Sequence, residues 1–134
     1  MITGGCLCGG VRYEVHGAFL RASHCPCSRC RRHTGTSHST QGRARRSDFR
    51  LVSGEGLVRV YTPEGGGAVK AFCVVWGSSL FGGKWPEGDE ITIRLGSLDG
   101  DPGNRPQFHT FVASKAPWDE ITDGLPQYAE YKPD

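Results

Sequence analysis

The segment Cys25-Pro26-Cys27-Ser28-Arg29-Cys30 places three cysteines on one short stretch of the chain. A run with C-x-C and C-x-x-C spacing can direct three thiolates from a single loop to one point, as zinc sites require. Three protein ligands with a fourth position left open are typical of a catalytic zinc site. The segment therefore predicts a small zinc-binding domain with Cys25, Cys27 and Cys30 at its active centre.

Two further cysteine segments extend this pattern, namely Cys6-Leu7-Cys8-Gly9 and the surroundings of Cys73. A glycine directly after a ligand lets the backbone turn with a positive φ and brings its amides near the sulfurs. A lone cysteine is usually a small buried hydrophobic residue, but cysteines in tight clusters favour metal binding over simple burial or disulfides. The candidate metal ligands are Cys6, Cys8, Cys25, Cys27, Cys30 and Cys73.

Length and composition favour one domain over residues 1–134 with a turn-rich, mainly β architecture. The chain has 134 residues, 20 of them glycine and 8 proline. No apolar stretch approaches the roughly 18 residues that a membrane helix needs. The N-terminus carries no basic region followed by an apolar run, so we expect a cytoplasmic protein whose cysteines stay reduced.

Alternation of apolar and polar residues predicts an antiparallel β domain with few short helices. The expected strands are 11–15, 49–52, 57–61, 69–75, 91–95 and 109–112. The glycine-containing segment 53–56 predicts a hairpin turn between the second and third of these strands. Short helical turns are expected at 28–33 and 118–121.

Charge is unevenly distributed along the chain although the net charge is only +2. Nine arginines but only two acidic residues lie in residues 1–50, whereas residues 85–134 hold four basic and ten acidic residues. Basic residues beside the cysteines suggest an anionic ligand, and Arg29, Arg31 and Arg32 are the candidates for binding it. Two oppositely charged, solvated faces would explain the same pattern without any ligand.

Several stretches together resemble the glutathione-dependent formaldehyde-activating enzyme family, whose domain is shared by centromere protein V. They are Gly5-Cys6-Leu7-Cys8-Gly9-Gly10-Val11-Arg12-Tyr13, His24-Cys25-Pro26-Cys27-Ser28-Arg29-Cys30, Phe72-Cys73-Val74-Val75-Trp76-Gly77-Ser78 and, near the end, Asp123-Gly124-Leu125-Pro126-Gln127-Tyr128. The resemblance implies a tent-like (Mss4-like) fold of antiparallel sheets with two zinc sites. It assigns a catalytic site to Cys25, Cys27 and Cys30, and a structural site to Cys6, Cys8, Cys73 and residue 76.

The activity implied by this resemblance joins formaldehyde to the thiol of glutathione, giving S-(hydroxymethyl)glutathione. This is the reaction of a carbon-sulfur lyase, and its partners are a small thiol and an aldehyde. In that scheme Cys25, Cys27 and Cys30 hold the catalytic zinc, while Arg29, Arg31 and Arg32 receive the glutathione carboxylates.

Trp76 departs from the family pattern, because the family usually has a fourth cysteine at this position. An indole N–H cannot ligate zinc, so the structural site has three thiolates at most. Two outcomes are open at this point. Another donor, such as water or one of the histidines 24, 33, 38 and 109, completes the site, or Trp76 fills an empty site as a hydrophobic plug.

Two other functions remain open on the sequence. The chain could be a non-enzymatic zinc-binding interaction module that contacts nucleic acid through its arginine-rich half, although its weak net charge argues against this. It could also act on a different thiol adduct, because a fold does not determine the substrate.

Overall fold

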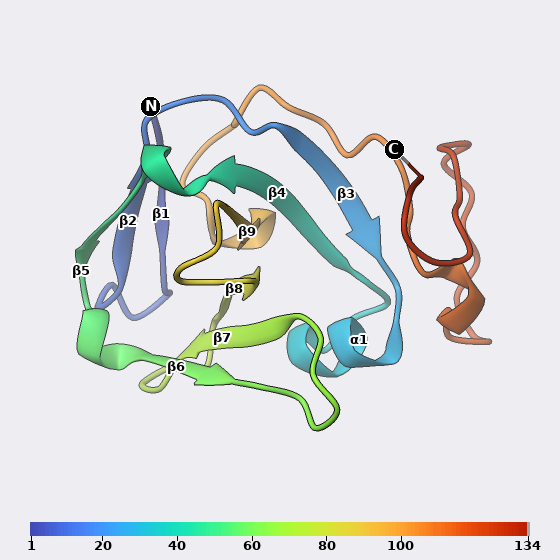
Figure 1. Ribbon diagram of the computed structural model, residues 1–134, viewed down its shortest axis with the longest axis horizontal. Coiled ribbons are helices and arrows are strands. Elements are labelled where there is room, and N and C mark those ends of the chain that lie inside the picture. The colour runs from blue at the N-terminus through green and yellow to red at the C-terminus, as the bar shows by residue number, and fades with distance from the viewer. Residues whose placement is uncertain (134) are drawn as a thin grey trace.

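Two antiparallel β-sheets form the frame of the computed structural model, which describes residues 1–133 (Figure 1). The smaller sheet has the strand order β1-β2-β5, with bounds Ile2–Gly5, Arg12–Val15 and Phe49–Ser53. The larger sheet has the order β3-β4-β9-β8-β7-β6. Its bounds are Arg21–Cys25, Ser39–Arg45, Glu90–Arg94, Ser79–Gly83, Val69–Cys73 and Val58–Tyr61. The predicted mainly β fold of antiparallel sheets is confirmed.

Helical structure is short, as the sequence predicts. Helix α1 spans Ser28–Thr34 and links β3 to β4, while four 3₁₀ turns lie elsewhere. The 3₁₀ turns are η1 (Arg46–Asp48), η2 (Glu55–Leu57), η3 (Leu95–Ser97) and η4 (Val112–Ser114). Among residues 1–133, no helix is long and apolar enough to cross a membrane.

The hydrophobic core lies between the two sheets. Tyr13 of β2 packs edge-on against Phe81 of β8, with 5.3 Å between ring centroids, and both side chains are buried. Side chains alternate between the faces of a strand, so Ile91 and Ile93 of β9 enter the core while Arg94 lies on the opposite face. The larger sheet therefore has one apolar face and one face that carries polar and charged groups.

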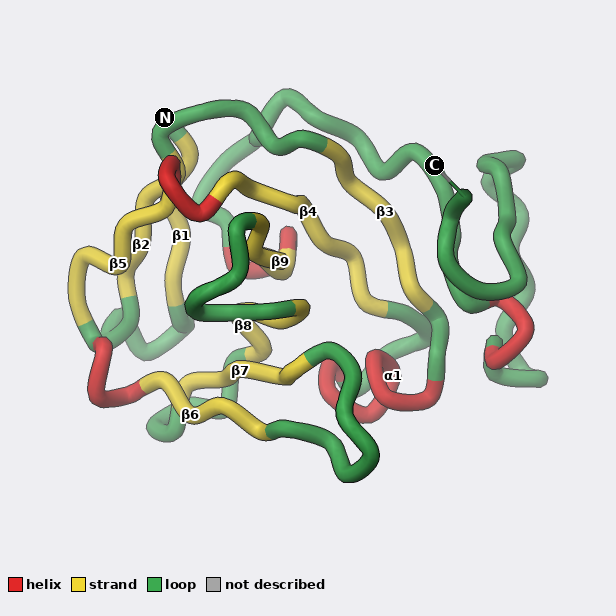
Figure 2. Tube along the Cα trace, in the orientation of Figure 1, coloured by secondary structure: helices red, strands yellow, loops and turns green. Residues whose placement is uncertain are grey.

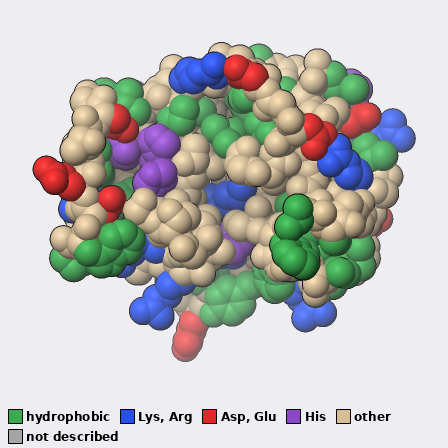
Figure 3. Space-filling view, turned by 180° about the vertical axis from the view of Figure 1, so that it is seen from behind, with side chains coloured by type: hydrophobic (Ala, Val, Ile, Leu, Met, Phe, Trp, Pro, Cys, Tyr) green, Lys and Arg blue, Asp and Glu red, His purple; other side chains and the backbone are tan. Residues whose placement is uncertain are grey.

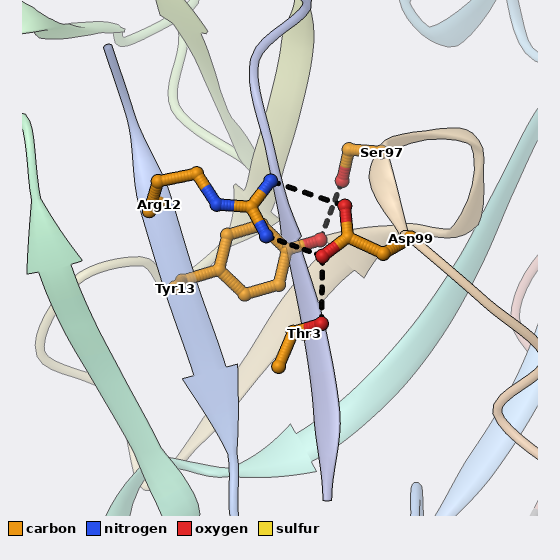
Figure 4. A network of polar contacts seen from close by, with 5 residues as sticks. All are labelled: Thr3, Arg12, Tyr13, Ser97 and Asp99. Carbon is orange, nitrogen blue, oxygen red and sulfur yellow. Dashed lines mark hydrogen bonds and ion pairs between the residues drawn. The ribbon is translucent and has the colours of Figure 1, made fainter. Parts of the chain in front are cut away.

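A polar network ties the smaller sheet to the segment that follows β9 (Figure 4). Arg12 of β2 forms a two-pronged ion pair with Asp99, and Thr3 of β1 donates a hydrogen bond of 2.6 Å to the same carboxylate. The hydroxyl of Tyr13 lies 2.6 Å from that of Ser97. The network closes the end of the fold that lies away from helix α1.

The last part of the chain is mostly irregular and runs beside β3 and α1 (Figure 2). It is attached to the larger sheet through parallel bridges between His24 and His109 and between His109 and Gln127. The chain after β9 therefore extends this sheet beyond β3 without forming a long strand.

Three local expectations are corrected. Residues 49–52 and 57–61 do not form a hairpin, because β5 pairs with β2 and β6 pairs with β7, and a 3₁₀ turn carries the chain between sheets. Residues 109–112 form two bridges, both at His109, and then a 3₁₀ turn, since Phe111 has a positive φ of 55° that ends any strand. Residues 118–121 form no helix, because the chain makes a turn at residues 117–118 and is irregular over 119–121.

Candidate metal centre

Helix α1 begins in the middle of the cysteine-rich segment, and this start brings three thiols together. Strand β3 ends at Cys25, and the sulfur of Cys27 caps α1 by accepting a hydrogen bond of 3.4 Å from the amide of Cys30. Gly35 ends the helix in the left-handed conformation that favours glycine. The sulfurs of Cys25, Cys27 and Cys30, called the cleft cluster below, all lie within 4.8 Å of one another.

This spacing fits a tetrahedral metal ion. Zinc–sulfur bonds of about 2.3 Å place neighbouring sulfurs of a tetrahedron roughly 3.8 Å apart, so only small side-chain rotations are needed. The three thiols form a group of their own and leave one tetrahedral position to an outside ligand. The cleft cluster can therefore hold a metal ion with an open coordination position.

Two buried cations accompany the cleft cluster, and sequence reasoning missed both. Lys70 of β7 is 8% exposed and its ammonium lies 3.4 Å from the sulfur of Cys30. Arg94 of β9 is 5% exposed and donates to Gln41 at 2.9 Å. Its Nε has no hydrogen-bond partner within residues 1–133. The strand periodicity could have found Lys70 and Arg94, since each stands next to a core residue, Ala71 or Ile93, on the opposite face of its strand.

The thiols of Cys25 and Cys30 in the cleft cluster have pKa values shifted in opposite directions. Hydrogen bonds from Cys25 and Cys27, together with the Lys70 ammonium, lower the pKa of Cys30 despite its burial. The same hydrogen bonds to Cys27 and Cys30, with burial, raise the pKa of Cys25. Burial lowers the pKa of Arg94, although the three nearby sulfurs oppose this shift when they are ionised. The metal-free cluster thus favours one thiolate at Cys30 beside Lys70.

The cleft cluster lies in the wall of a cleft of about 1150 Å³. The larger sheet, α1 and the C-terminal segment all contribute to its lining, and the lining is strongly basic. One carboxylate, Glu90, faces these cations and lies 2.8 Å from Arg21. The basic lining residues are Arg21, Arg29, Arg43, Lys70, Arg94 and Lys132. A ligand with negative charges is favoured in such a cleft.

The structure separates the three arginines of the cysteine-rich segment. Arg29 lines the cleft, where its guanidinium donates a 3.0 Å hydrogen bond to the carbonyl of Gly66. Arg31 donates to the backbone carbonyls of Pro26 and Ser114, so it ties α1 to the chain after β9. Arg32 is exposed and is not part of the cleft lining. Of the three, Arg29 is the residue placed to meet a ligand beside the cysteines.

Cys6, Cys8 and Cys73 form a second group, called the outer cluster below, and their sulfurs also lie within 4.8 Å of one another. The Cys6–Cys8 and Cys8–Cys73 sulfur distances are 3.4 Å and 3.7 Å, close to the edge of a zinc–sulfur tetrahedron. The hydroxyl of Ser78 lies 3.1 Å from the Cys6 sulfur. Burial opposes ionisation of Cys6, but hydrogen bonds from Ser78 and the Cys8 backbone outweigh it and lower its pKa to about 7. The outer cluster can also hold a metal ion.

The structure argues against two of the suggestions for the fourth position of the outer cluster, a Trp76 plug and a histidine donor, and leaves water as a prediction. Trp76 is 63% exposed on a turn, so it does not plug the site. Within the described chain, no histidine nitrogen joins the group formed by the three sulfurs. Sequence reasoning missed Ser78, whose hydroxyl lies beside the Cys6 sulfur. A serine is not a usual zinc ligand, so its spacing from the cysteines gave no signal.

Comparison with known proteins identifies the family of the chain. A family model described as glutathione-dependent formaldehyde-activating enzyme matches residues 1–114, which include all six cysteines. The chain belongs to this family. The matched region of the formaldehyde-activating family ends before the C-terminal segment that covers one side of the cleft.

A solved structure extends the likeness to nearly the whole chain. The crystal structure of a Rhodobacter sphaeroides protein is similar to this family member with a TM-score of 0.62 and 26% sequence identity. The similarity covers 94% of this chain and 98% of that one. A search of the curated proteins gives no significant match.

Proposed function

We propose that the cleft cluster binds zinc and that the chain is a carbon-sulfur lyase acting on the adduct of a small thiol, such as glutathione, with an aldehyde, such as formaldehyde. The observation that carries this proposal is the joint placement of three thiols and six basic side chains around one cleft. Glutathione combines a thiol with two carboxylates. Its thiol suits the metal held by the cysteines, and its carboxylates suit the basic side chains of the lining. Membership of the formaldehyde-activating family supports the same substrates.

The metal would be held by Cys25, Cys27 and Cys30. Bound there, a zinc ion supplies Lewis acidity and one open coordination position. The protein adds two buried positive charges beside it, from Lys70 and Arg94. These charges offset the negative charge of the sulfurs, so an anion can approach a site that would otherwise repel it.

The reaction makes or breaks one C–S bond and moves a proton to or from the oxygen. In the synthetic direction the thiol loses its proton, the thiolate sulfur donates an electron pair to the aldehyde carbon, the C=O π bond opens onto oxygen, and that oxygen takes up a proton. In the lyase direction the hydroxyl loses its proton, the C=O bond forms again, and the electron pair of the C–S bond returns to sulfur, which takes up a proton. Lys70 lies beside the sulfurs and is placed to stabilise the negative oxygen that forms between these states. All six cysteines are free, which suits a reducing cytoplasm where glutathione is abundant.

Glutathione binding and exchange with formaldehyde test the proposal together. The zinc-loaded protein should bind glutathione in calorimetry and speed the exchange of formaldehyde with its adduct, seen by NMR. Cys27→Ser should abolish both effects, because Cys27 is a half-buried member of the cleft cluster. Cys8→Ser is the matched control, since it changes a cysteine of the outer cluster. Equal binding by the wild type and Cys27→Ser, or none by either, contradicts the proposal.

The basic lining gives an independent test of the substrate's charge. Arg43→Gln should weaken glutathione binding, because Arg43 lines the cleft. Arg45→Gln changes an exposed arginine of the same strand outside the cleft and should leave binding unchanged. Equal weakening by both variants would show that overall charge attracts the ligand without a defined contact in the cleft.

A further inference from the structure

A third group of metal-binding side chains lies outside both cysteine clusters. One donor atom from each of His24, His109 and Asp123 lies within 4.8 Å of the other two. The imidazole rings of His24 and His109 stack with 4.7 Å between centroids, and a third ring, His38, lies 4.5 Å from that of His24. Figure 3 shows a patch of neighbouring histidine side chains on one side of the face seen there. Three of the five imidazoles of the chain, those of His24, His38 and His109, therefore lie together.

This group lies on the opposite side of the sheet from the cleft cluster. Successive residues of a strand face opposite sides, so Cys25 lines the cleft while His24 faces away from it. The same alternation holds in the segment beside β3, where Phe108 and Thr110 line the cleft and His109, between them, does not. The histidine group is thus a separate site, and an ion bound there would have no direct contact with the cleft.

The immediate surroundings hold these side chains as metal ligands are usually held. Thr40 lies 2.8 Å from Nδ1 of His24 and so anchors one nitrogen of that ring. The Asp123 carboxylate accepts a hydrogen bond from the backbone of Leu125 and lies 2.8 Å from Nε2 of His109. The contacts from Thr40 and Leu125 come from outside the group and orient two of its side chains before a metal binds.

His109 carries a buried nitrogen that the protein leaves without a partner. Its side chain is 4% exposed, and its Nδ1 atom finds no hydrogen-bond partner in residues 1–133. Leaving a buried polar atom unpaired costs free energy, so such atoms often mark a site for an ion or a ligand. Asp123 is 40% exposed and opens the group to solvent, which gives an ion a way in.

From these contacts we infer that His24, His109 and Asp123 form a binding site for a divalent transition-metal ion, with His38 beside it as a further imidazole donor. Two imidazoles and a carboxylate suit zinc, cobalt or nickel and lack the sulfur that distinguishes the cysteine clusters. The site does not depend on the proposed function, and the two can fail separately.

Metal binding here would fasten the C-terminal segment to the sheet. Asp123 belongs to that segment, whereas His24 belongs to β3. The same segment supplies Tyr128 and Tyr131 to the cleft lining. An ion that joins Asp123 to β3 would therefore hold the C-terminal segment, one wall of the cleft, in place. It should also protect that segment from proteolysis.

Zinc titration of protein whose cysteine clusters are already saturated with zinc tests the site. Saturation is checked by the loss of thiol alkylation, and binding is followed through the histidine ring signals in NMR. We expect one further equivalent to bind and to shift the ring signals of His24 and His109. Asp123→Asn should weaken this binding at least about tenfold, because it removes a charged ligand. His24→Gln, which removes a different ligand, should do the same.

Asp101→Asn is the matched control, because Asp101 is an exposed, ion-paired aspartate outside the group. It should leave the zinc titration unchanged, and near-ultraviolet circular dichroism should show that all three variants keep the native fold. Cys27→Ser should also retain the additional equivalent. The inference is overturned if saturated protein takes up no further zinc, or if Asp123→Asn and His24→Gln bind it as the wild type does.

Discussion

The ammonium of Lys70 lies 3.4 Å from the sulfur of Cys30, and both side chains are buried. A buried lysine loses the hydration that normally stabilises its charge, so it needs a negative partner. Cys30 supplies that partner when it is ionised, and the lysine in turn lowers the pKa of the thiol. This pair links β7, in the middle of the chain, to the helix that carries the cysteine-rich segment.

Lys70→Met should weaken zinc binding at the cleft cluster by about tenfold, the size of effect expected for an outer contact of a metal site. Methionine keeps much of the volume but removes the charge, so the pKa of Cys30 rises and its thiolate forms less readily. Competition with a zinc-binding dye measures the effect. Lys84→Met, at an exposed lysine outside the cleft, should match the wild type. An unchanged zinc affinity in Lys70→Met would mean that the ammonium has no part in holding the metal.

Trp76→Cys should strengthen metal binding at the outer cluster. The substitution creates a C-x-x-C pair with Cys73, which is the spacing of closed four-thiolate zinc sites. Resistance of bound zinc to a chelator measures the gain. Trp118→Cys adds a cysteine at another exposed tryptophan and should give no such resistance. Equal behaviour of the two variants would show that residue 76 cannot reach the ion.

The stability of the fold should depend on Asp99 in acid. Arg12 and Thr3 lower the pKa of Asp99 from 3.8 to about 2 in the folded protein. A group with a lowered pKa in the folded state stabilises the fold above its unfolded pKa, near 4, and this contribution is lost as the pH falls towards 2. Urea unfolding at several pH values should therefore show a smaller acid loss in Asp99→Asn than in the wild type.

Asp89→Asn serves as the control for that experiment, because Asp89 is an exposed aspartate outside the network of Figure 4. The difference in free energy of unfolding between Asp89→Asn and the wild type should be the same at pH 6 and at pH 2.5. If Asp99→Asn and the wild type lose stability in parallel, the ion pair with Arg12 contributes nothing to folding.

Phe81→Ala should destabilise the protein by about 3–5 kcal/mol, the usual cost of removing a buried aromatic ring. Phe81 is fully buried and touches the rings of Tyr13 and Trp85, so its loss leaves a cavity between the two sheets. Thermal or urea unfolding measures the change. Val60→Ala, at an exposed position of β6, should stay within about 0.5 kcal/mol of the wild type.

Sequence reasoning reached the sulfur ligands because short spacing along the chain forces them together. Cys25, Cys27 and Cys30 are close in space for the same reason that they are close in sequence, since one strand end and one helix start hold all three. The alternating strands β2 and β9 were found for a similar reason, as their periodicity repeats over neighbouring residues.

What sequence reasoning missed depends on contacts between distant segments. Lys70 and Arg94 meet the cysteines only because β7 and β9 belong to the same sheet as β3. The strands β3 and β4 were not predicted, because Ser, Gln, Gly and Arg give them weak strand propensity. Long-range pairing fixes them, since β9 pairs with β4 and β4 pairs with β3. The expected hairpin around Gly54 failed because a turn signal does not say which sheet each flanking strand will join.

The register between β3 and β4 has a consequence for how this protein can change over time. His24 pairs with Thr40, and Cys25 pairs with Ser39, so adjacent residues bring nitrogen to one surface and sulfur to the other. A slip by one residue would exchange the two surfaces and carry both donors away from their partners. Insertions and deletions in this strand pair should therefore be rejected as a class. Substitution is then the one route by which either surface can acquire a new ligand without losing the other.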